Sequence, residues 1–327
     1  MPPIHVPPTA VPPAHVGPFA LGTFAAPVGR PFAGLVTGEV VRELPGTVLD
    51  LLADWDAALP RLGELATRVG GTRWRLDDLR VLPPLAPGQV LQSGANYRQH
   101  VVDLVAAERH SVHGRTTAEA RADAEAMMDE RIARGTPYVF LGSTRAVCGA
   151  YDDVRLPARG GQHDWELELA AVIGRPAWRV PRSEALAHVA GYTICNDLTT
   201  RDLVHRADLK GIGTDWYASK NAPTFLPTGP YLVPAAFVGN PMDLRITLRH
   251  NGVTRQDEST KDMIFDVARL VEYASSVQPL LPGDLLLTGS PAGNGAASGV
   301  FLTAGDVLEG EISGLGGQRN RCVGTED

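Results

Sequence analysis

The sequence is poor in cysteine and has no long hydrophobic run, and each scarcity excludes a class of protein. Its 327 residues include three widely spaced cysteines, which favours a reducing compartment over a disulfide framework and lacks the paired spacing of a zinc site. No apolar run is long enough for a membrane-spanning helix. The N-terminus lacks the basic residues and apolar core of a secretory signal. We therefore expect a cytoplasmic protein without a membrane partner.

Positive charge is also scarce. Thirty Lys and Arg residues stand against 37 Asp and Glu residues, giving a formal net charge of −7. Such a chain has no basic field to attract nucleic acid or anionic lipid. The 44% hydrophobic and 20% charged content is ordinary for a globular protein, and the length allows one large domain with a small one attached.

Clusters of proline and glycine divide the chain. Residues 1–18 are rich in proline and are expected to form an extended arm that packs little. Residues 19–88 are expected to form a small N-terminal α+β domain, ending in a linker at 81–88 where clustered Pro and Gly interrupt both helical and strand periods. Residues 89–327 then form the main domain.

Within the small domain, the pattern predicts two strands followed by helix. Strand-like segments occupy 19–24 and 34–41, and a helical pattern runs from 49 to 68. Pro60 is expected to split this pattern into two shorter helices, because proline removes a backbone donor and clashes with the preceding turn.

A charged, alanine-rich segment at residues 104–136 predicts a helical insertion. Thr116 and Glu119 have the spacing of a capping box, and Gly135 suits a helix C-terminus. The apolar patch of this helix comprises Met127, Met128 and Ile132. Two interpretations stay open: a surface helix packed on the body, or a lid over a site.

The rest of the main domain is rich in β signals. Residues 244–250 alternate in polarity, and Asn251-Gly252 supplies a two-residue hairpin turn before the next strand. Turn residues also precede short strands at 285–289 and 307–312. The fold class predicted is therefore α+β and β-rich.

A pair of acids lies inside a strand-like run at residues 164–174. Glu166 and Glu168 are two residues apart, so in a strand they point to the same face. Two carboxylates side by side repel each other unless positive charge lies between them. A divalent cation that prefers oxygen ligands would supply that charge. Alone, however, a Glu-x-Glu pair is more often a solvated strand face.

Four further residues extend this pattern. Asp197 would complete a set of three carboxylates, which with waters suits Mg²⁺ or Mn²⁺. Lys220 follows aromatic residues and could pair with a substrate carboxylate or an enolate oxygen. His100 and Asp103 are three apart, so on one helical turn the carboxylate can orient the imidazole as a base. A lone histidine is more often structural and a lone lysine is usually solvated.

In combination and order, these segments resemble the fumarylacetoacetate hydrolase family, in its bacterial acylpyruvase or 2-hydroxyhepta-2,4-diene-1,7-dioate isomerase-like branch. The resemblance covers residues 90–323. It rests on the ordered segments 96–100, 164–170, 191–197, 201–202, 219–220, 227–230, 251–256, 281–284, 288–291, 305–306 and 314–316.

The resemblance implies a mixed β-roll or barrel with a metal at its mouth, in a homodimer. The implied metal ligands are Glu166, Glu168 and Asp197, holding Mg²⁺ or Mn²⁺, with Ca²⁺ as a substitute in crystals. It implies that His100 is the base with Asp103, and that Lys220 binds substrate and stabilises charge. The implied substrate contacts are Tyr97, Arg201, Gly289 and Ser290.

The activity implied is a divalent-metal-dependent hydrolysis on a small oxo-acid. It cleaves a C–C bond in a 1,3-diketo acid of the acylpyruvate or fumarylpyruvate kind, by His-activated water and a metal-stabilised enolate. The same site could instead serve an oxo-acid decarboxylase, a hydroxymuconate-type isomerase or a hydratase. A non-catalytic metal-binding member of the family is a further alternative.

The chain also departs from the family pattern. Asp103 stands where Glu is common, Gly142 where many members have a lysine, Val204 where Gln is frequent, and Ser290 where Thr is usual. The segment at 104–135 is longer than typical. These departures leave the implied metal ligands unchanged but alter the implied substrate pocket, so no single substrate is implied. The apolar patch of the insertion favours a larger or more apolar substrate than the smallest oxo-acids.

Overall fold

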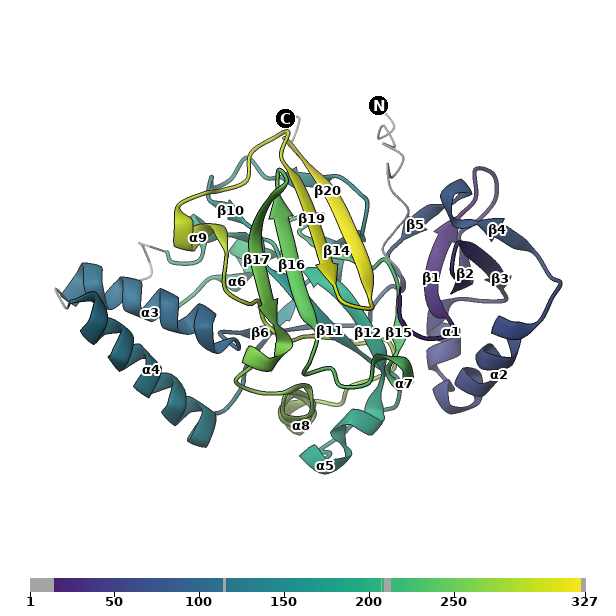
Figure 1. The fold of residues 1–327 in the computed structure, drawn as a ribbon, viewed down its shortest axis with the longest axis horizontal. Helices are drawn as coiled ribbons and strands as arrows, with labels where there is room; N and C mark the ends of the chain where they lie inside the picture. Colours follow the sequence, from purple (N-terminus) through teal and green to yellow (C-terminus); the bar gives the residue numbers. More distant parts are fainter. Residues whose placement is uncertain (1–14, 114–115, 207, 209–212, 325–327) are drawn as a thin grey trace.

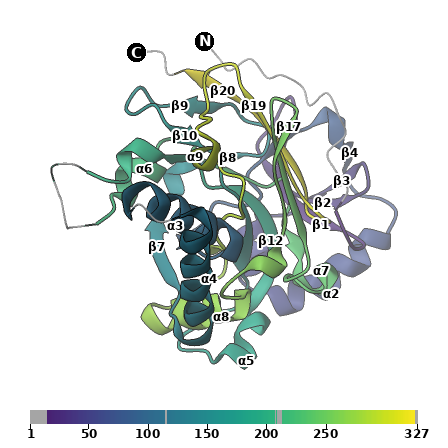
Figure 2. The ribbon, with the colours of Figure 1, turned by 60° about the vertical axis from the view of Figure 1, so that its left-hand side comes forward.

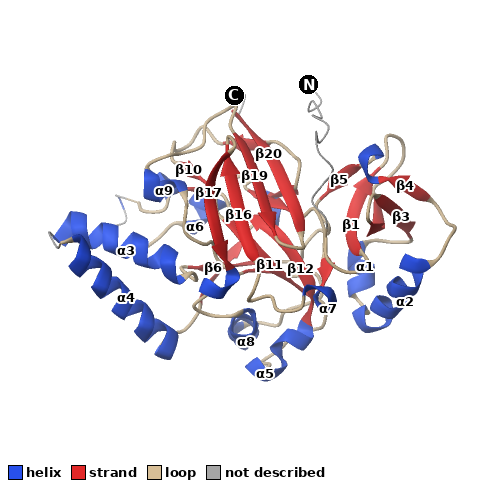
Figure 3. Cartoon of the chain, viewed as in Figure 1, coloured by secondary structure: helices blue, strands red, loops and turns tan. Residues whose placement is uncertain are grey.

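The computed structural model describes residues 15–113, 116–206, 208 and 213–324. It is a strand-rich α+β structure in which two large curled sheets pack together and a smaller sheet lies to one side (Figures 1 and 3). The predicted fold class is confirmed.

The small sheet lies wholly within the predicted N-terminal domain. Its strand order is β4-β3-β2-β1-β5, with bounds β1 Ala20–Ala25, β2 Phe32–Thr37, β3 Val40–Leu44, β4 Arg73–Arg75 and β5 Arg80–Leu82. Two helices accompany it, α1 Val48–Leu52 and α2 Trp55–Thr67 (Figure 1). Leu21 joins it to the main body by backbone hydrogen bonds of 2.9 and 2.8 Å with Leu232. The exact division into domains stays a prediction.

Two local predictions in this domain were wrong. The strand expected at 34–41 is two strands, because Gly38 turns the chain with φ of 58°. The helices do separate, but at residues 53–54, and Pro60 lies inside α2. Asp54 leaves helical geometry with φ of −140°, whereas Pro60 removes a single hydrogen bond from a helix that continues past it.

The main domain contains two large mixed sheets. The first has the order β7-β6-β18-β11-β12-β14-β8, with β15 paired to β12. Its bounds are β6 Val90–Gly94, β7 Tyr138–Gly142, β8 Val147–Gly149, β11 Leu167–Ile173, β12 Val189–Asn196, β14 Leu226–Thr228, β15 Val233–Pro234 and β18 Leu285–Leu287. β11 is buried along its whole length, so this sheet carries the centre of the core.

The second large sheet covers the first. Its order is β17-β16-β19-β20-β9, with bounds β9 Val154–Leu156, β16 Arg245–His250, β17 Val253–Ser259, β19 Val307–Ile312 and β20 Gly316–Gly324. A Cβ at Gly310 would lie 2.6 Å from Leu167, so the two sheets approach closely where this glycine faces β11. A short pair, β10 His163–Asp164 and β13 Thr199–Thr200, closes one end.

The predicted hairpin and turns of this domain are confirmed. Asn251 and Gly252 have φ of 51° and 78°, the left-handed pair that a tight hairpin between β16 and β17 needs. Strands β18 and β19 follow the two other predicted turns.

The predicted insertion is a helical hairpin of α3 Arg98–His113 and α4 Thr117–Arg134, which projects from the body (Figures 1 and 2). Thr116 caps α4 through a reciprocal capping box with Glu119, as the spacing predicted. Met128 is buried, whereas Met127 and Ile132 are 37% and 49% exposed. The remaining helices are α5 Arg182–Ala185, α6 Trp216–Lys220, α7 Ala235–Val238, α8 Val267–Val277 and α9 Gly295–Ser298.

Three chain-wide expectations can be compared with the structure. All three cysteines are buried and free. None of the helices in the described ranges combines the length and hydropathy needed to cross a bilayer. Most of the predicted N-terminal arm lies outside the described residues; of the remainder, Val16 packs on the body, its N–H donating to the carbonyl of Gly314 at 2.8 Å.

Candidate metal centre and active site

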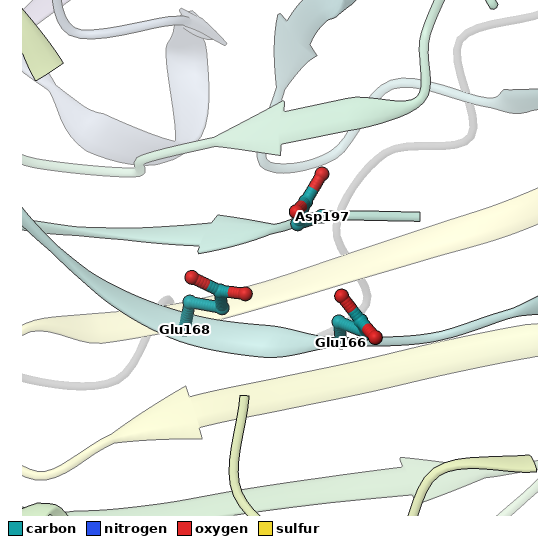
Figure 4. Close-up of side chains that lie close together, drawn as sticks. All are labelled: Glu166, Glu168 and Asp197. Atoms are coloured by element: carbon teal, nitrogen blue, oxygen red, sulfur yellow. The ribbon is translucent and has the colours of Figure 1, made fainter. Parts of the chain in front are cut away.

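Three buried carboxylates meet at the end of two neighbouring strands (Figure 4). Glu166 immediately precedes β11, Glu168 lies within it, and Asp197 immediately follows β12. The two strands are antiparallel, and the Asp197 N–H extends their ladder by donating to the Glu166 carbonyl at 2.8 Å. One carboxylate oxygen from each acid lies within 4.8 Å of the others. The structure thus brings together the three residues that the sequence singled out.

Two buried cations hold this acid cluster. Lys220, at the end of α6, donates to Glu166 Oε2 at 2.7 Å, Asp197 Oδ2 at 2.6 Å and Thr199 Oγ1 at 2.7 Å. Arg201 donates to Glu166 Oε1 at 2.6 Å and Asp164 Oδ2 at 2.7 Å. Lys220 Nζ also lies 3.3 Å from the Asp197 carbonyl oxygen, so all three of its N–H donors are engaged. Donating to a substrate would require one of these contacts to be released.

The pKa values of the three carboxyls shift in different directions. Burial alone would raise the pKa of Glu166, but the charges of Lys220 and Arg201 outweigh it and lower that pKa to about 2. Burial raises the pKa of Asp197 to about 6, despite Lys220. Burial, reinforced by the charges of Asp197 and Glu166, raises the pKa of Glu168 well above its ordinary value. The cluster thus lacks enough positive charge to ionise fully.

The residues present fit a divalent cation. Four carboxylates stand against two cations in this buried region: Asp164, Glu166, Glu168 and Asp197 against Lys220 and Arg201. When all four are ionised, the shortfall of two positive charges equals the charge of one divalent ion. Oε2 of Glu168 accepts from the Gly289 N–H at 2.7 Å, while its Oε1 has no hydrogen-bond partner among the described residues. The donor atoms are all oxygens, as Mg²⁺ and Mn²⁺ prefer.

Two residues that support the cluster, Gln92 and Asp164, were given no functional role in our sequence interpretation. Gln92 donates to Asp197 Oδ1 at 2.5 Å from β6, which β18 separates from β11 in the sheet. Asp164 accepts from the N–H groups of Gly295 and Ala296 at 2.6 and 3.0 Å, as well as from Arg201. The available signal was a polar side chain inside an otherwise apolar buried strand, because such a group needs a partner.

His100 lies near the cluster, at the start of α3, and is buried. Burial lowers its pKa, with Glu166 and Arg201 acting in opposite directions. Asp103, its predicted partner, is engaged elsewhere: it accepts from Gln99 Nε2 at 2.6 Å and from Arg121 Nη1 at 3.3 Å. The pairing of His100 with Asp103 stays a prediction.

The four predicted substrate contacts differ in their burial and in their hydrogen-bond partners. Gly289 has φ of 90°, and a Cβ there would lie 2.9 Å from Asn96, so glycine is needed to aim its N–H at Glu168. Ser290 is buried and accepts from Gln256 Nε2 at 3.0 Å. Tyr97 is fully buried, and burial raises the pKa of its hydroxyl. Arg201 is tied to two acids, so the substrate roles of all four stay predictions.

The protein has a β-rich α+β fold, and its three buried acids form a candidate metal centre. Residues 89–323 match the fumarylacetoacetate (FAA) hydrolase C-terminal domain, and the chain belongs to this family.

Known proteins of this family differ in activity. The chain is 42% identical over 188 residues to 2,4-didehydro-3-deoxy-L-rhamnonate hydrolase of Sphingomonas sp. strain SKA58, covering 57% of this chain and 64% of that protein. It is 38% identical over 189 residues to human mitochondrial oxaloacetate tautomerase FAHD2B, covering 57% and 59%. Each match spans less than two thirds of the relative.

A solved structure is similar over nearly the whole chain. It is that of 2-hydroxyhepta-2,4-diene-1,7-dioate isomerase from Mycobacterium marinum, with a TM-score of 0.69 and 29% identity, covering 94% of this chain and 100% of that one. Hydrolases, tautomerases and isomerases thus share this family and fold.

Proposed function

We propose that the protein is a divalent-metal-dependent hydrolase of 2,4-dioxo acids. It cleaves the C–C bond that joins the outer carbonyl carbon, C4, to the methylene carbon between the two carbonyls. The acid cluster of Glu166, Glu168 and Asp197 carries this proposal, because its geometry and charge deficit fit one Mg²⁺ or Mn²⁺. The 42% identity to a hydrolase supports the choice of reaction.

A divalent ion bound there would supply Lewis acidity toward the oxygens of an oxo-acid. The chain's own residues would do the rest. His100, neutral because burial lowers its pKa, takes a proton from a water molecule at a ring nitrogen. The water oxygen attacks the outer carbonyl, and the bond to the methylene carbon then breaks.

The two fragments leave as a carboxylic acid, which releases its proton to solvent, and a pyruvate enolate. Lys220 stabilises the enolate charge once one of its present contacts is released. The proton held by His100 returns to the methylene carbon, which gives pyruvate and restores the base. One water is consumed and no redox partner is needed.

Turnover in ¹⁸O-labelled water tests this reaction. We expect a 2,4-dioxo acid to be cleaved only with Mg²⁺ or Mn²⁺, and one labelled oxygen to enter the new carboxylate. Metal-dependent turnover of oxo-acids without labelled carboxylate would overturn the hydrolase proposal.

Isomerisation or tautomerisation at the same site is the second candidate. It is favoured by the likeness to the M. marinum isomerase, which extends over 94% of this chain, and by the 38% identity to a tautomerase. In these reactions a proton moves between carbon atoms or between carbon and oxygen, and no C–C bond breaks. The same experiment would then give an unlabelled product with all carbons retained, whereas a hydratase would place the label in an alcohol.

A further inference from the structure

Three aromatic side chains form a continuous surface beside the acid cluster. Phe140 stacks on Trp216 with ring centroids 5.1 Å apart and planes 15° apart. Tyr138 lies next to Phe140 at 5.7 Å, and its hydroxyl accepts from Trp216 Nε1 at 2.7 Å. We call Tyr138, Phe140 and Trp216 the aromatic shelf. Tyr138 is 44% exposed and the other two are half-buried, so the shelf retains open apolar surface.

The shelf is fixed next to the cluster from two directions. Phe140 on β7 is the cross-strand partner of Gln92 on β6, so the two side chains share one face of the sheet. Gln92 in turn donates to Asp197. From the other direction, Lys220 Nζ lies 5.9 Å from the centroid of the Trp216 ring. In Figure 2, β7 and α6 lie near each other on the side that carries α3.

Gly142 continues the same face of β7 without adding charge. A Cβ at this position would lie 2.6 Å from Gln92 Oε1, so β7 approaches the Gln92 side chain closely here. Residues 138, 140 and 142 therefore present two aromatic rings and a gap, and no basic group, toward Gln92.

Four cations among the described residues, Lys220, Arg201, Arg98 and Arg121, are paired with acids. Lys220 and Arg201 contact the cluster acids. On the helical hairpin, Arg98 pairs with Asp129 at 2.8 Å and Arg121 pairs with Asp103 and Glu125. A second carboxylate on a substrate would meet the aromatic shelf without a free cation from these four residues, and burying an unpaired charge there is costly.

We propose that the aromatic shelf binds the acyl substituent of the substrate, and that this substituent is an uncharged aromatic or branched aliphatic group. The inference rests on the proposed function, because the oxo-acid end must lie at the acid cluster. The flat ring surfaces would stack on such a group and exclude water from it.

Activity on matched substrates tests the shelf. The substrates are 2,4-dioxo-4-phenylbutanoate, 2,4-dioxopentanoate and a 2,4-dioxo acid with a carboxylate at its far end. We expect the phenyl compound to have the highest kcat/KM. Phe140→Leu and Trp216→Leu should each lower that value about tenfold, the size of one lost aromatic contact, and change the methyl compound less than about twofold. Tyr217→Leu is the matched control, because Tyr217 is the next residue of α6 and is 83% exposed.

A binding measurement separates this inference from the proposed reaction. The probe is 2-oxo-4-phenylbutanoate, which lacks the second carbonyl and cannot be hydrolysed in this way. Its control is 2-oxopentanoate, which has no phenyl ring. We expect the phenyl probe to bind the manganese-loaded protein at least about tenfold more tightly and to quench tryptophan fluorescence. Trp216→Phe should remove most of the quenching, whereas Trp178→Phe, at an exposed tryptophan that stacks with Arg179, should not.

The outcomes are distinguishable. Shelf-dependent binding of the phenyl probe without hydrolysis of any dioxo acid would refute the proposed function and support the shelf. Hydrolysis that favours the acid-tailed substrate, or phenyl binding unchanged in both Leu variants, would overturn the shelf and leave the hydrolase standing.

Discussion

An ionised Glu168 would favour metal binding but destabilise the metal-free protein, because burial and the neighbouring acids disfavour its charge. Its raised pKa means that its protonated form contributes stability below the unfolded value of 4.5, and that this stability is lost as pH rises toward the folded pKa. A neutral amide avoids that loss and can still accept the Gly289 N–H.

We therefore expect Glu168→Gln to stabilise the metal-free protein at neutral pH and to abolish metal binding. In the wild type, Mn²⁺ at 100 times its Kd should add about 2.7 kcal/mol, and in the variant nothing. Thermal unfolding with and without Mn²⁺ measures both effects. A variant that is less stable without metal yet still stabilised by it would show that Glu168 is no ligand.

His100 supplies the second residue-scale prediction. Its pKa lies below the ordinary 6.5, so the neutral base persists to lower pH. The decrease of kcat/KM at acid pH should therefore have its midpoint below pH 6.5. His100→Ala should lower kcat by about 10²–10⁴-fold and leave Mn²⁺ affinity unchanged.

Asp103 provides the comparison for His100. Because it contacts Gln99 and Arg121, Asp103→Asn should change kcat less than about threefold, far below the effect expected of a base. A loss as large as that of His100→Ala would mean that the two residues pair during the reaction.

Residue-level prediction from the sequence succeeded where strand geometry was enough. The spacing of Glu166 and Glu168 placed both carboxylates on one face, and Asp197, the third acid that the sequence singled out, lies at the end of β12. The contacts of Asp103 were not predictable in this way, because Arg121 reaches it from the other helix of the hairpin and helical spacing says nothing about that.

At the scale of single elements, α4 has a matched counterpart in α1. Both begin with a threonine capping box, at Thr116 and Thr47, in the hairpin and the N-terminal domain respectively. Their equivalent caps allow the role of the hairpin as a lid to be separated from general stability.

We expect Thr116→Ala and Thr47→Ala each to cost about 0.5–2 kcal/mol in their own helix, seen as faster amide hydrogen exchange. If the hairpin is a lid, only Thr116→Ala should also raise KM. Equal KM values in both variants would favour the alternative interpretation of a surface helix.

Element prediction was reliable where local chemistry decides the structure. The capping box of α4 and the Asn251-Gly252 hairpin are short-range signals, and both elements formed as expected. Pro60 misled the interpretation because the break between α1 and α2 comes from the backbone of Asp54. A proline marks a weak point in a helix without fixing where that helix ends.

For the whole molecule, we propose a cytoplasmic homodimer, as the family resemblance implies. One chain has a mass of 34.8 kDa, so light scattering during gel filtration should give twice that value at micromolar concentration. A mass of one chain, with full activity, would contradict the dimer.

The sheet order itself was not predictable from the sequence, because parallel pairs such as β6 with β18 join segments nearly 200 residues apart.

The account depends most on a divalent ion at the acid cluster, and anomalous diffraction from crystals soaked in manganese tests it most directly. We predict one anomalous peak within coordinating distance of Glu166, Glu168 and Asp197, which is lost in Glu168→Gln. No peak there at full activity, with Lys220 still bridging Glu166 and Asp197, would contradict the account.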